Sequence, residues 1–233
     1  MQPIGNKLAD LQQIPAPWYV GPYFILTLAL LLSAIVYPIG AEVFGSGVLQ
    51  ITNTALLVTS VYAVVKHKWL FRILLILVIP IVFSIWFVDP YDDHEALDWI
   101  SSFSTNAFLF TVLVVVFADV IRSKRVTADT IFGAVAVYLL FGVVMAMLFQ
   151  FMNNINPGSV IASVGEATNV LERYDQFGDI LYFSFVTLTS VGYGDLTPIA
   201  APARSLAMFE GVVGQLYLAI LIARLVGIHI AQE

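Results

Sequence analysis

The sequence predicts an all-α membrane protein with six transmembrane helices, a shorter re-entrant helix and a glycine-rich loop after it. Hydrophobic residues make up 60% of the 233 residues and charged residues only 11%, with a mean hydropathy of +0.91. Soluble domains carry about 25% charged residues, so this composition is typical of a chain that lies in a lipid bilayer. The chain has no cysteine, which excludes disulfide bonds, thiol chemistry and cysteine-bound metals.

Six apolar stretches are long enough to cross a bilayer, which takes roughly 20 residues of helix. They are residues 18–39, 48–65, 70–88, 103–121, 131–152 and 206–230. A seventh stretch, residues 180–190, is too short to cross. It is predicted to enter the membrane and turn back, which backbone does only where protein or a water-filled cavity covers it. The polar residues 1–17 show no signal-peptide pattern and are expected to form a cytoplasmic N-terminus.

Charged residues are sorted by membrane side. If the loop after the short helix opens outward, eight of the ten basic residues lie in the cytoplasm, as the positive-inside rule requires. They are Lys7, Lys66, Lys68, Arg72, Arg122, Lys124, Arg125 and Arg224. Acidic residues collect outside, in residues 89–98 and at Asp175 and Asp179. They either attract cations toward the mouth of the protein or are only solvated. The sequence therefore predicts a multi-pass protein of the plasma (cell inner) membrane with both termini in the cytoplasm.

Residues 187–195 read TLTSVGYGD and carry the main functional signal. Gly192 and Gly194 permit backbone dihedrals that other residues resist, so successive carbonyls can point at one axis. Carbonyls arranged in this way replace the hydration shell of a bare cation. The stretch resembles the selectivity filter of the six-transmembrane-helix, tetrameric potassium channels of prokaryotic type.

The resemblance implies a homotetramer, because four copies of the loop surround one ion path in that family. It also implies that the filter segment, residues 190–194, binds K+ ions directly. The expected site is formed by Ser190, Val191, Gly192, Tyr193 and Gly194, with K+ on the backbone oxygens of the first four and on the Ser190 hydroxyl. No other cofactor is expected.

Support for the filter segment is assigned to Asp195, Tyr182, Thr187 and Thr189. Tyr182 stands where the resembling channels carry a bracing aromatic residue. Its hydroxyl is expected to donate a hydrogen bond to Asp195, unless the ring only packs against a neighbouring helix. Phe183 and Val186 stand at two other bracing positions but offer no polar group. The filter segment is therefore expected to have few polar braces.

The last apolar stretch is expected to line the pore. Gly214 stands where the resembling channels have a gating hinge, although a glycine there also permits close helix packing. Helical spacing places Leu218, Ile222 and Val226 toward the axis, and such an apolar lining can gate by dewetting. The fourth apolar stretch, residues 103–121, carries no ladder of basic residues, so gating is expected at this constriction or at the filter segment.

Polar side chains inside apolar stretches need partners, because unpaired polar groups are costly in a bilayer. Glu210 is expected to pair either with a hydroxyl behind the filter segment or with Arg204, and such a residue is a functional candidate by default. Gln50 and Asn53 are expected to form hydrogen bonds between helices.

Four domains are predicted along the chain: the N-terminus 1–17, a four-helix bundle 18–121, a cytoplasmic linker 122–130 and a pore domain 131–230. The bundle resembles a voltage-sensor domain in position but lacks its charges. The fourth stretch contains no arginine or lysine before Arg122, whereas voltage sensing needs 3–4 gating charges per subunit. Asp119 and Arg122 are three residues apart and are expected to pair. Conventional voltage gating is therefore not expected.

The function expected from these features is passive, potassium-selective conduction across the membrane. The alternatives are a weakly selective cation channel and the pore subunit of an ion transport system. An enzyme is not expected, because the three histidines lie on different segments and no metal-binding cluster or nucleophile motif is visible. The net charge of −6 does not suggest nucleic acid binding. The expected partners are further copies of the chain, the lipid bilayer and K+, and a regulatory partner protein is left open.

Overall fold

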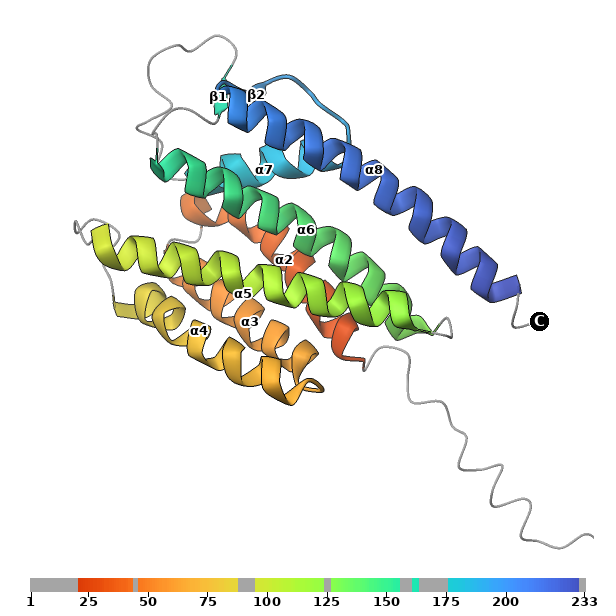
Figure 1. Cartoon of the computed structure of the whole chain (residues 1–233). Coiled ribbons are helices and arrows are strands. Elements are labelled where there is room, and N and C mark those ends of the chain that lie inside the picture. The colour runs from red at the N-terminus through yellow and green to blue at the C-terminus, as the bar shows by residue number, and fades with distance from the viewer. Residues whose placement is uncertain are drawn as a thin grey trace, which may run out of the picture.

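The computed structural model describes residues 21–43, 46–87, 95–123, 127–155, 161–163 and 176–230. The described part is almost entirely helical, as the sequence predicts. Its helices are α2 (Pro22–Val43), α3 (Ser46–Val64), α4 (Lys68–Phe87), α5 (Glu95–Arg122), α6 (Ala128–Ile155), α7 (Gln176–Leu188) and α8 (Ala201–Ile230). Figure 1 shows α2 to α6 and α8 running side by side, with the shorter α7 between α6 and the start of α8.

The long helices are those of a membrane protein. Helices α3, α4, α5, α6 and α8 are each long and apolar enough to cross a bilayer. The described apolar part of α2, Pro22–Tyr37, is shorter than a full span, although the helix itself continues to Val43. Some observed helix ends differ from the predicted ones. For example, α8 begins at Ala201 rather than at residue 206, and α7 ends at Leu188 rather than at residue 190.

Helices α2 to α5 form a bundle with an apolar interior. Leu26, Leu30, Phe108 and Val112 are essentially inaccessible to solvent there. Gln50 and Asn53 each form a hydrogen bond between helices, as expected. Gln50 Nε2 donates to the Ile85 carbonyl at 3.0 Å, and the Tyr37 hydroxyl donates to Asn53 Oδ1 at 2.5 Å. These bonds satisfy polar groups at membrane depth, so a structural role accounts for both residues.

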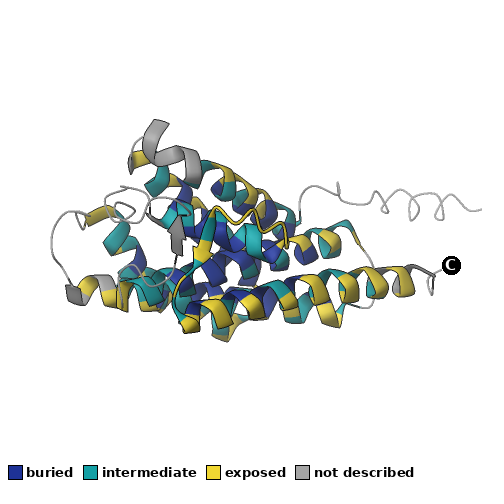
Figure 2. Cartoon of the chain, turned by 90° about the horizontal axis from the view of Figure 1, so that it is seen from above, coloured by how far each residue is buried: buried dark blue, intermediate teal, exposed yellow. Residues whose placement is uncertain are grey.

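Helix α6 occupies the centre of the molecule. It packs against α2 and α5 on one side and against α7 and α8 on the other. In its span 61% of the residues are buried, against only 11% in the span of α8. The exposed residues along α8 are visible as the yellow segments of the helix that leads to the C-terminus in Figure 2. In this single chain, α8 therefore presents most of its apolar surface to lipid or to another protein chain.

A short two-stranded sheet, which the sequence did not predict, lies next to the filter segment. Strand β1 (Ile161–Ser163) pairs antiparallel with β2 (Leu196–Pro198), with Ala162 opposite Thr197. Each strand has only three residues, too few to leave an alternating hydrophobic pattern. The pairing ties the chain that leaves the filter segment to the connection between α6 and α7.

The expected pairing of Asp119 with Arg122 is wrong. The Asp119 carboxylate instead accepts one hydrogen bond from the Tyr23 hydroxyl and contacts His67 Nε2, and both residues come from other parts of the bundle. Arg122 is exposed at the last turn of α5. Helical spacing made the local pair possible, but tertiary packing brought Tyr23 and His67 within hydrogen-bonding distance of the Asp119 carboxylate.

Candidate functional site

Helix α7 ends in a turn that leads into the filter segment. The Ser190 N–H donates to the Thr187 carbonyl at 2.9 Å, and the Val191 N–H donates to the Val186 carbonyl at 3.0 Å. These two bonds form a Schellman motif, which needs a left-handed residue at the position that Ser190 occupies. Ser190 indeed has a φ of 57°, unusual for a residue other than glycine. The serine accepts this strain while keeping a hydroxyl at the inner end of the segment.

The backbone of the filter segment alternates in handedness. Ser190, Gly192 and Gly194 have φ values of 57°, 56° and 80°, whereas Val191 and Tyr193 do not have positive φ. In an ordinary strand successive carbonyls point to opposite sides, but alternation in the sign of φ turns them toward one side. The N–H groups of residues 190–192 bond back to α7, since Gly192 N–H also donates to the Val186 carbonyl at 3.3 Å. The carbonyls are thereby free to face away from α7.

The expected brace between Tyr182 and Asp195 is present. The Tyr182 hydroxyl donates to Asp195 Oδ2 at 2.8 Å, and this hydrogen bond holds the pKa of the Asp195 carboxyl below its usual value. The neighbouring Phe183 is buried with its ring edge-on to Phe149 at 5.2 Å and donates nothing to the filter segment. The only polar brace of this kind among the described residues is therefore the one from Tyr182.

Thr187 and Thr189 support the filter segment through the end of α7 and not through hydroxyl bonds to the segment itself. Thr189 Oγ1 donates back to the Phe185 carbonyl at 2.7 Å, so its side chain closes the last turn of α7. Thr187 contributes its backbone carbonyl, which accepts the Ser190 N–H. Both residues thus support the turn into the filter segment.

Gln215 of α8 contacts the filter segment directly. Its Nε2 donates to the Ser190 hydroxyl oxygen at 3.1 Å. Sequence spacing alone did not show this partner, because the two residues are 25 positions apart and on different elements. The contact holds the Ser190 hydroxyl between α7 and the inner helix α8.

Glu210 is buried behind the filter segment and joins three helices. Its side chain is fully shielded from solvent, and Ser184 Oγ on α7 lies 2.5 Å from Glu210 Oε1. Ser184 Oγ also lies 2.8 Å from the Gly142 carbonyl on α6. One hydroxyl hydrogen cannot serve both acceptors, so a neutral Glu210 whose Oε1 carries the proton and donates to Ser184 satisfies both contacts of this hydroxyl, while Glu210 Oε2 is buried without a partner. Of the two expected partners the hydroxyl is therefore the correct one, since Arg204 Nε donates to the Pro198 carbonyl instead.

Of the two glycines Gly211 and Gly214, the second lies closer to the end of α7. A Cβ added at Gly214 would stand 2.5 Å from the Leu188 carbonyl oxygen and 2.6 Å from Leu188 Cδ1. A Cβ at Gly211 would stand 3.6 Å from the Thr187 carbonyl oxygen, an ordinary contact. Gly214 therefore permits close packing, and its role as a hinge stays a prediction.

Beyond Gly214, the predicted pore-lining residues follow one another down α8. Leu218 is half-buried, whereas Ile222 and Val226 are 60% and 52% exposed in the single chain. Val191 and Tyr193 of the filter segment are likewise 52% and 71% exposed. The filter segment and the lower part of α8 thus leave large apolar side chains uncovered.

Comparison with known proteins identifies this part of the chain. A family model described as an ion channel matches residues 133–229, which include α7, the filter segment and almost all of α8. The chain is also 32% identical to Protein LctB of Bacillus caldotenax over 104 residues, which are 45% of this chain and 75% of that protein. It is 29% identical to Protein LctB of Geobacillus stearothermophilus over 113 residues, 47% of this chain and 79% of that protein. The chain belongs to the ion channel family.

The channel has no metal-binding cluster among its described residues, where no group of three His, Cys, Asp or Glu side chains gathers. Membership of a channel family favours a non-enzymatic transport role. Most of the acidic groups expected at the outer mouth lie outside the described residues: Asp175 and most of residues 89–98 are among them. The polar chemistry that the structure does describe near the filter segment is that of Ser190, Asp195 and Glu210 with their partners.

Proposed function

We propose that this channel conducts K+ passively and selectively through a pore formed by four identical chains. The observation that carries the proposal is the alternating handedness at Ser190, Gly192 and Gly194, together with N–H groups turned back to α7. That backbone presents carbonyls on one side at successive levels, which is the arrangement that substitutes for the hydration shell of an ion. K+ is the permeant ion, bound by the backbone oxygens of residues 190–193 and the Ser190 hydroxyl.

The homotetramer is supported by what one chain leaves uncovered. A single filter segment provides one wall of a site and cannot surround an ion. The apolar side chains of Val191, Tyr193, Ile222 and Val226 are exposed, and the span of α8 is the least buried of the long helices together with α4. Fourfold assembly about an axis beside α8 would cover these residues and place four sets of carbonyls around one path.

Gating is proposed at the filter segment or at the apolar constriction around Leu218, Ile222 and Val226. Helix α5 carries no basic residue before Arg122, so the membrane potential has little charge to move within the bundle. The proposed orientation places both termini in the cytoplasm of a cell with the channel in its plasma membrane, as the positive-inside rule requires for the basic residues. The bundle 18–121, linker 122–130 and pore domain 131–230 are the proposed units.

A weakly selective cation channel is the second candidate. It is favoured by the small number of side-chain braces from α7, where Tyr182 bonds Asp195 but Phe183 and Val186 cannot add another. A filter segment with fewer braces would tolerate distortion more easily. The two candidates make different predictions only for the ratio of K+ to Na+ permeability.

Flux through reconstituted protein tests the proposal. In liposomes with a K+ gradient, the wild-type protein is expected to carry K+, whereas Gly192→Ala and Gly194→Ala are expected to lose flux because both glycines have positive φ. Gly47→Ala is the matched control, since its added Cβ meets nothing within 4 Å and lies in the bundle. Wild-type liposomes without K+ flux, or filter variants that conduct like the control, would contradict the proposal. A particle with the mass of a monomer or dimer would contradict the tetramer.

A further inference from the structure

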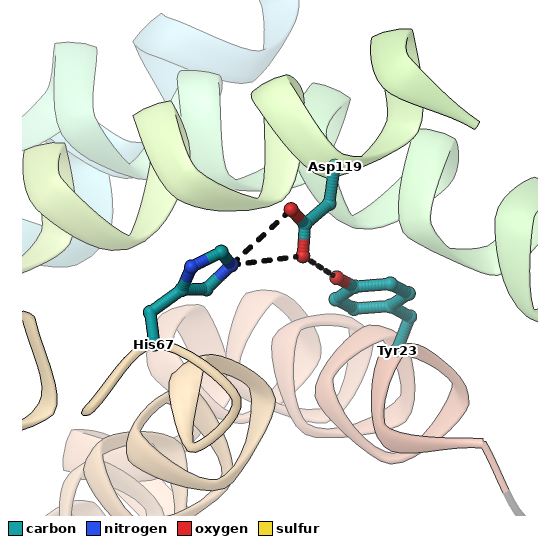
Figure 3. Close-up of polar contacts among 3 residues, drawn as sticks. All are labelled: Tyr23, His67 and Asp119. Carbon is teal, nitrogen blue, oxygen red and sulfur yellow. Dashed lines mark hydrogen bonds and ion pairs between the residues drawn. The ribbon is translucent and has the colours of Figure 1, made fainter.

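A cluster of three polar residues lies at the end of the molecule opposite the filter segment. Tyr23 lies in the first turn of α2, His67 in the turn between α3 and α4, and Asp119 in the last turns of α5 (Figure 3). The Tyr23 hydroxyl donates to Asp119 Oδ2 at 2.6 Å. His67 Nε2 lies 3.2 Å and 3.4 Å from the two oxygens of the same carboxylate. One carboxylate therefore joins three otherwise separate parts of the bundle.

Other charged groups surround the cluster without replacing its imidazole. Lys66 Nζ lies 5.6 Å from the centre of the Tyr23 ring, and Asp129 at the start of α6 accepts the Tyr23 backbone N–H at 3.2 Å. On α4, Lys68 and Arg72 are exposed, and so is Arg122 on α5. Within the described part of the chain, His67 forms the one ion pair with an acidic group at 4.0 Å or less. Protonation of this imidazole is thus the charge change that Asp119 meets most directly.

The turn that carries Asp119 is also where the inner helix α8 meets the bundle. The Arg224 guanidinium donates to the backbone carbonyls of Val120, Ile121 and Ser123, at 2.7 Å for Val120 and 2.9 Å for Ser123. These carbonyls end α5, where a cation is favoured by the helix dipole. The Ser123 N–H donates to the Asp119 carbonyl at 3.1 Å. The same turn thus contacts the cluster through a side chain and α8 through its backbone.

Elsewhere α5 and α8 are separated by an apolar groove. It has a volume of about 600 Å³, and its walls include Phe117 of α5, Val137 of α6 and Ile220 of α8. The rings of Phe117 and Tyr217 approach across it with centroids 6.4 Å apart. The polar connection from the bundle to the lower part of α8 therefore runs through residues 119–123 and Arg224. That part of α8 carries Ile222 and Val226, the proposed constriction.

We propose that His67 and Asp119 form a proton-binding site, and that its occupancy is transmitted through residues 119–123 and Arg224 to the lower end of α8. A histidine changes charge between about pH 5 and 8. When the imidazole is protonated, its hydrogen bonds to the carboxylate become charge-assisted and stronger. Acidification on the side opposite the filter segment therefore stabilises the observed conformation at the end of α5. The carbonyls that accept hydrogen bonds from Arg224 belong to this end. The inference rests on the proposed channel function only in its effect on conduction.

Hydrogen exchange tests the site without reference to conduction. For the full-length protein in bilayer discs, protection of residues 119–123 is compared at pH 5.5 and pH 8.0 after correction for the intrinsic exchange rate. We expect about tenfold greater protection at pH 5.5, a coupling within the usual 5–150-fold range. The increase should be lost in His67→Gln and kept in Lys68→Gln, a neighbouring exposed base. Equal protection at both pH values in the wild type, or an unchanged increase in His67→Gln, would overturn the proposal.

Single-channel recording tests the transmission. With the pH changed only on the side opposite the filter segment, the open-to-closed ratio of the wild type should change about tenfold between pH 8.0 and 5.5. His67→Gln and Arg224→Gln should each reduce this change to less than twofold while still conducting. A full pH response in Arg224→Gln would overturn the transmission step. Protein that shows the exchange effect but carries no ion current would refute the channel function and leave the proton site standing.

Discussion

Replacing Gly214 by alanine gives the most sharply defined perturbation of the pore. The added Cβ would stand 2.5 Å from the Leu188 carbonyl oxygen, whereas ordinary contact begins at about 3.4 Å, so α8 and the end of α7 must part by roughly 0.9 Å. Overpacking of this kind costs about 1–3 kcal/mol. The shift also disturbs the hydrogen bond that the Tyr138 hydroxyl donates to the same carbonyl at 3.3 Å.

Gly211→Ala on the same helix is the matched control. Both substitutions gain helix propensity of about 1 kcal/mol, but the Cβ at Gly211 meets the Thr187 carbonyl at an ordinary 3.6 Å. We expect Gly211→Ala to be as stable as the wild type or more stable, and Gly214→Ala to be less stable than Gly211→Ala by about 1–3 kcal/mol. Unfolding of the purified protein by increasing amounts of dodecyl sulfate measures the difference. Because the propensity gain is common to both variants, the difference isolates the clash.

The result also separates packing from hinge bending at Gly214. If this glycine served only as a hinge, alanine would stiffen the helix, raise the stability and alter the open-to-closed ratio. Gly214→Ala that is at least as stable as Gly211→Ala would therefore refute the packing argument. The expected outcome is instead lower stability together with lower K+ flux, because the displaced Leu188 begins the turn into the filter segment.

Three further predictions concern other parts of the channel. In Tyr182→Phe the pKa of Asp195 should rise toward its usual value, because the hydrogen bond that lowers it is lost. Loss of current on acidifying the filter side should then begin at a higher pH than in the wild type, as recordings at stepped pH would show. Glu210→Gln should keep wild-type stability within about 1 kcal/mol, whereas Glu210→Ala should lose about 2 kcal/mol, because it removes one hydrogen bond of Ser184 and leaves a cavity beside it; equal losses would contradict the hydrogen-bond chain. The open probability should depend only weakly on voltage, and equally weakly in Arg122→Gln; a steep dependence that survives in this variant would contradict the account of the bundle.

Much of the fold follows from the sequence, because bilayer physics acts on single segments. Hydropathy and length were enough to predict the long helices and the short α7. The Tyr182 to Asp195 hydrogen bond was expected from the resemblance, because Tyr182 stands where the resembling channels carry a bracing aromatic residue. The positive φ values at Gly192 and Gly194 confirm that both glycines adopt backbone dihedrals that other residues resist.

Contacts between distant segments could not be predicted. Asp119 contacts His67 and Tyr23 rather than Arg122, because the packing of the four helices determines which side of α5 faces the bundle interior. Arg224 was counted only as a cytoplasmic charge, yet it caps the end of α5 from a helix about 100 positions away. Such pairings depend on the relative placement of helices, about which hydropathy and spacing carry no information.

The central claim is that the filter segment selects K+ over Na+ with its carbonyls. The most direct test is the reversal potential of the purified protein in a planar bilayer, with K+ on one side and the same concentration of Na+ on the other. The account predicts a large reversal potential of the sign that K+ permeation requires, and its disappearance in Gly192→Ala if that variant still conducts. A wild-type reversal potential near zero would show that the channel passes both ions alike and would contradict potassium selectivity.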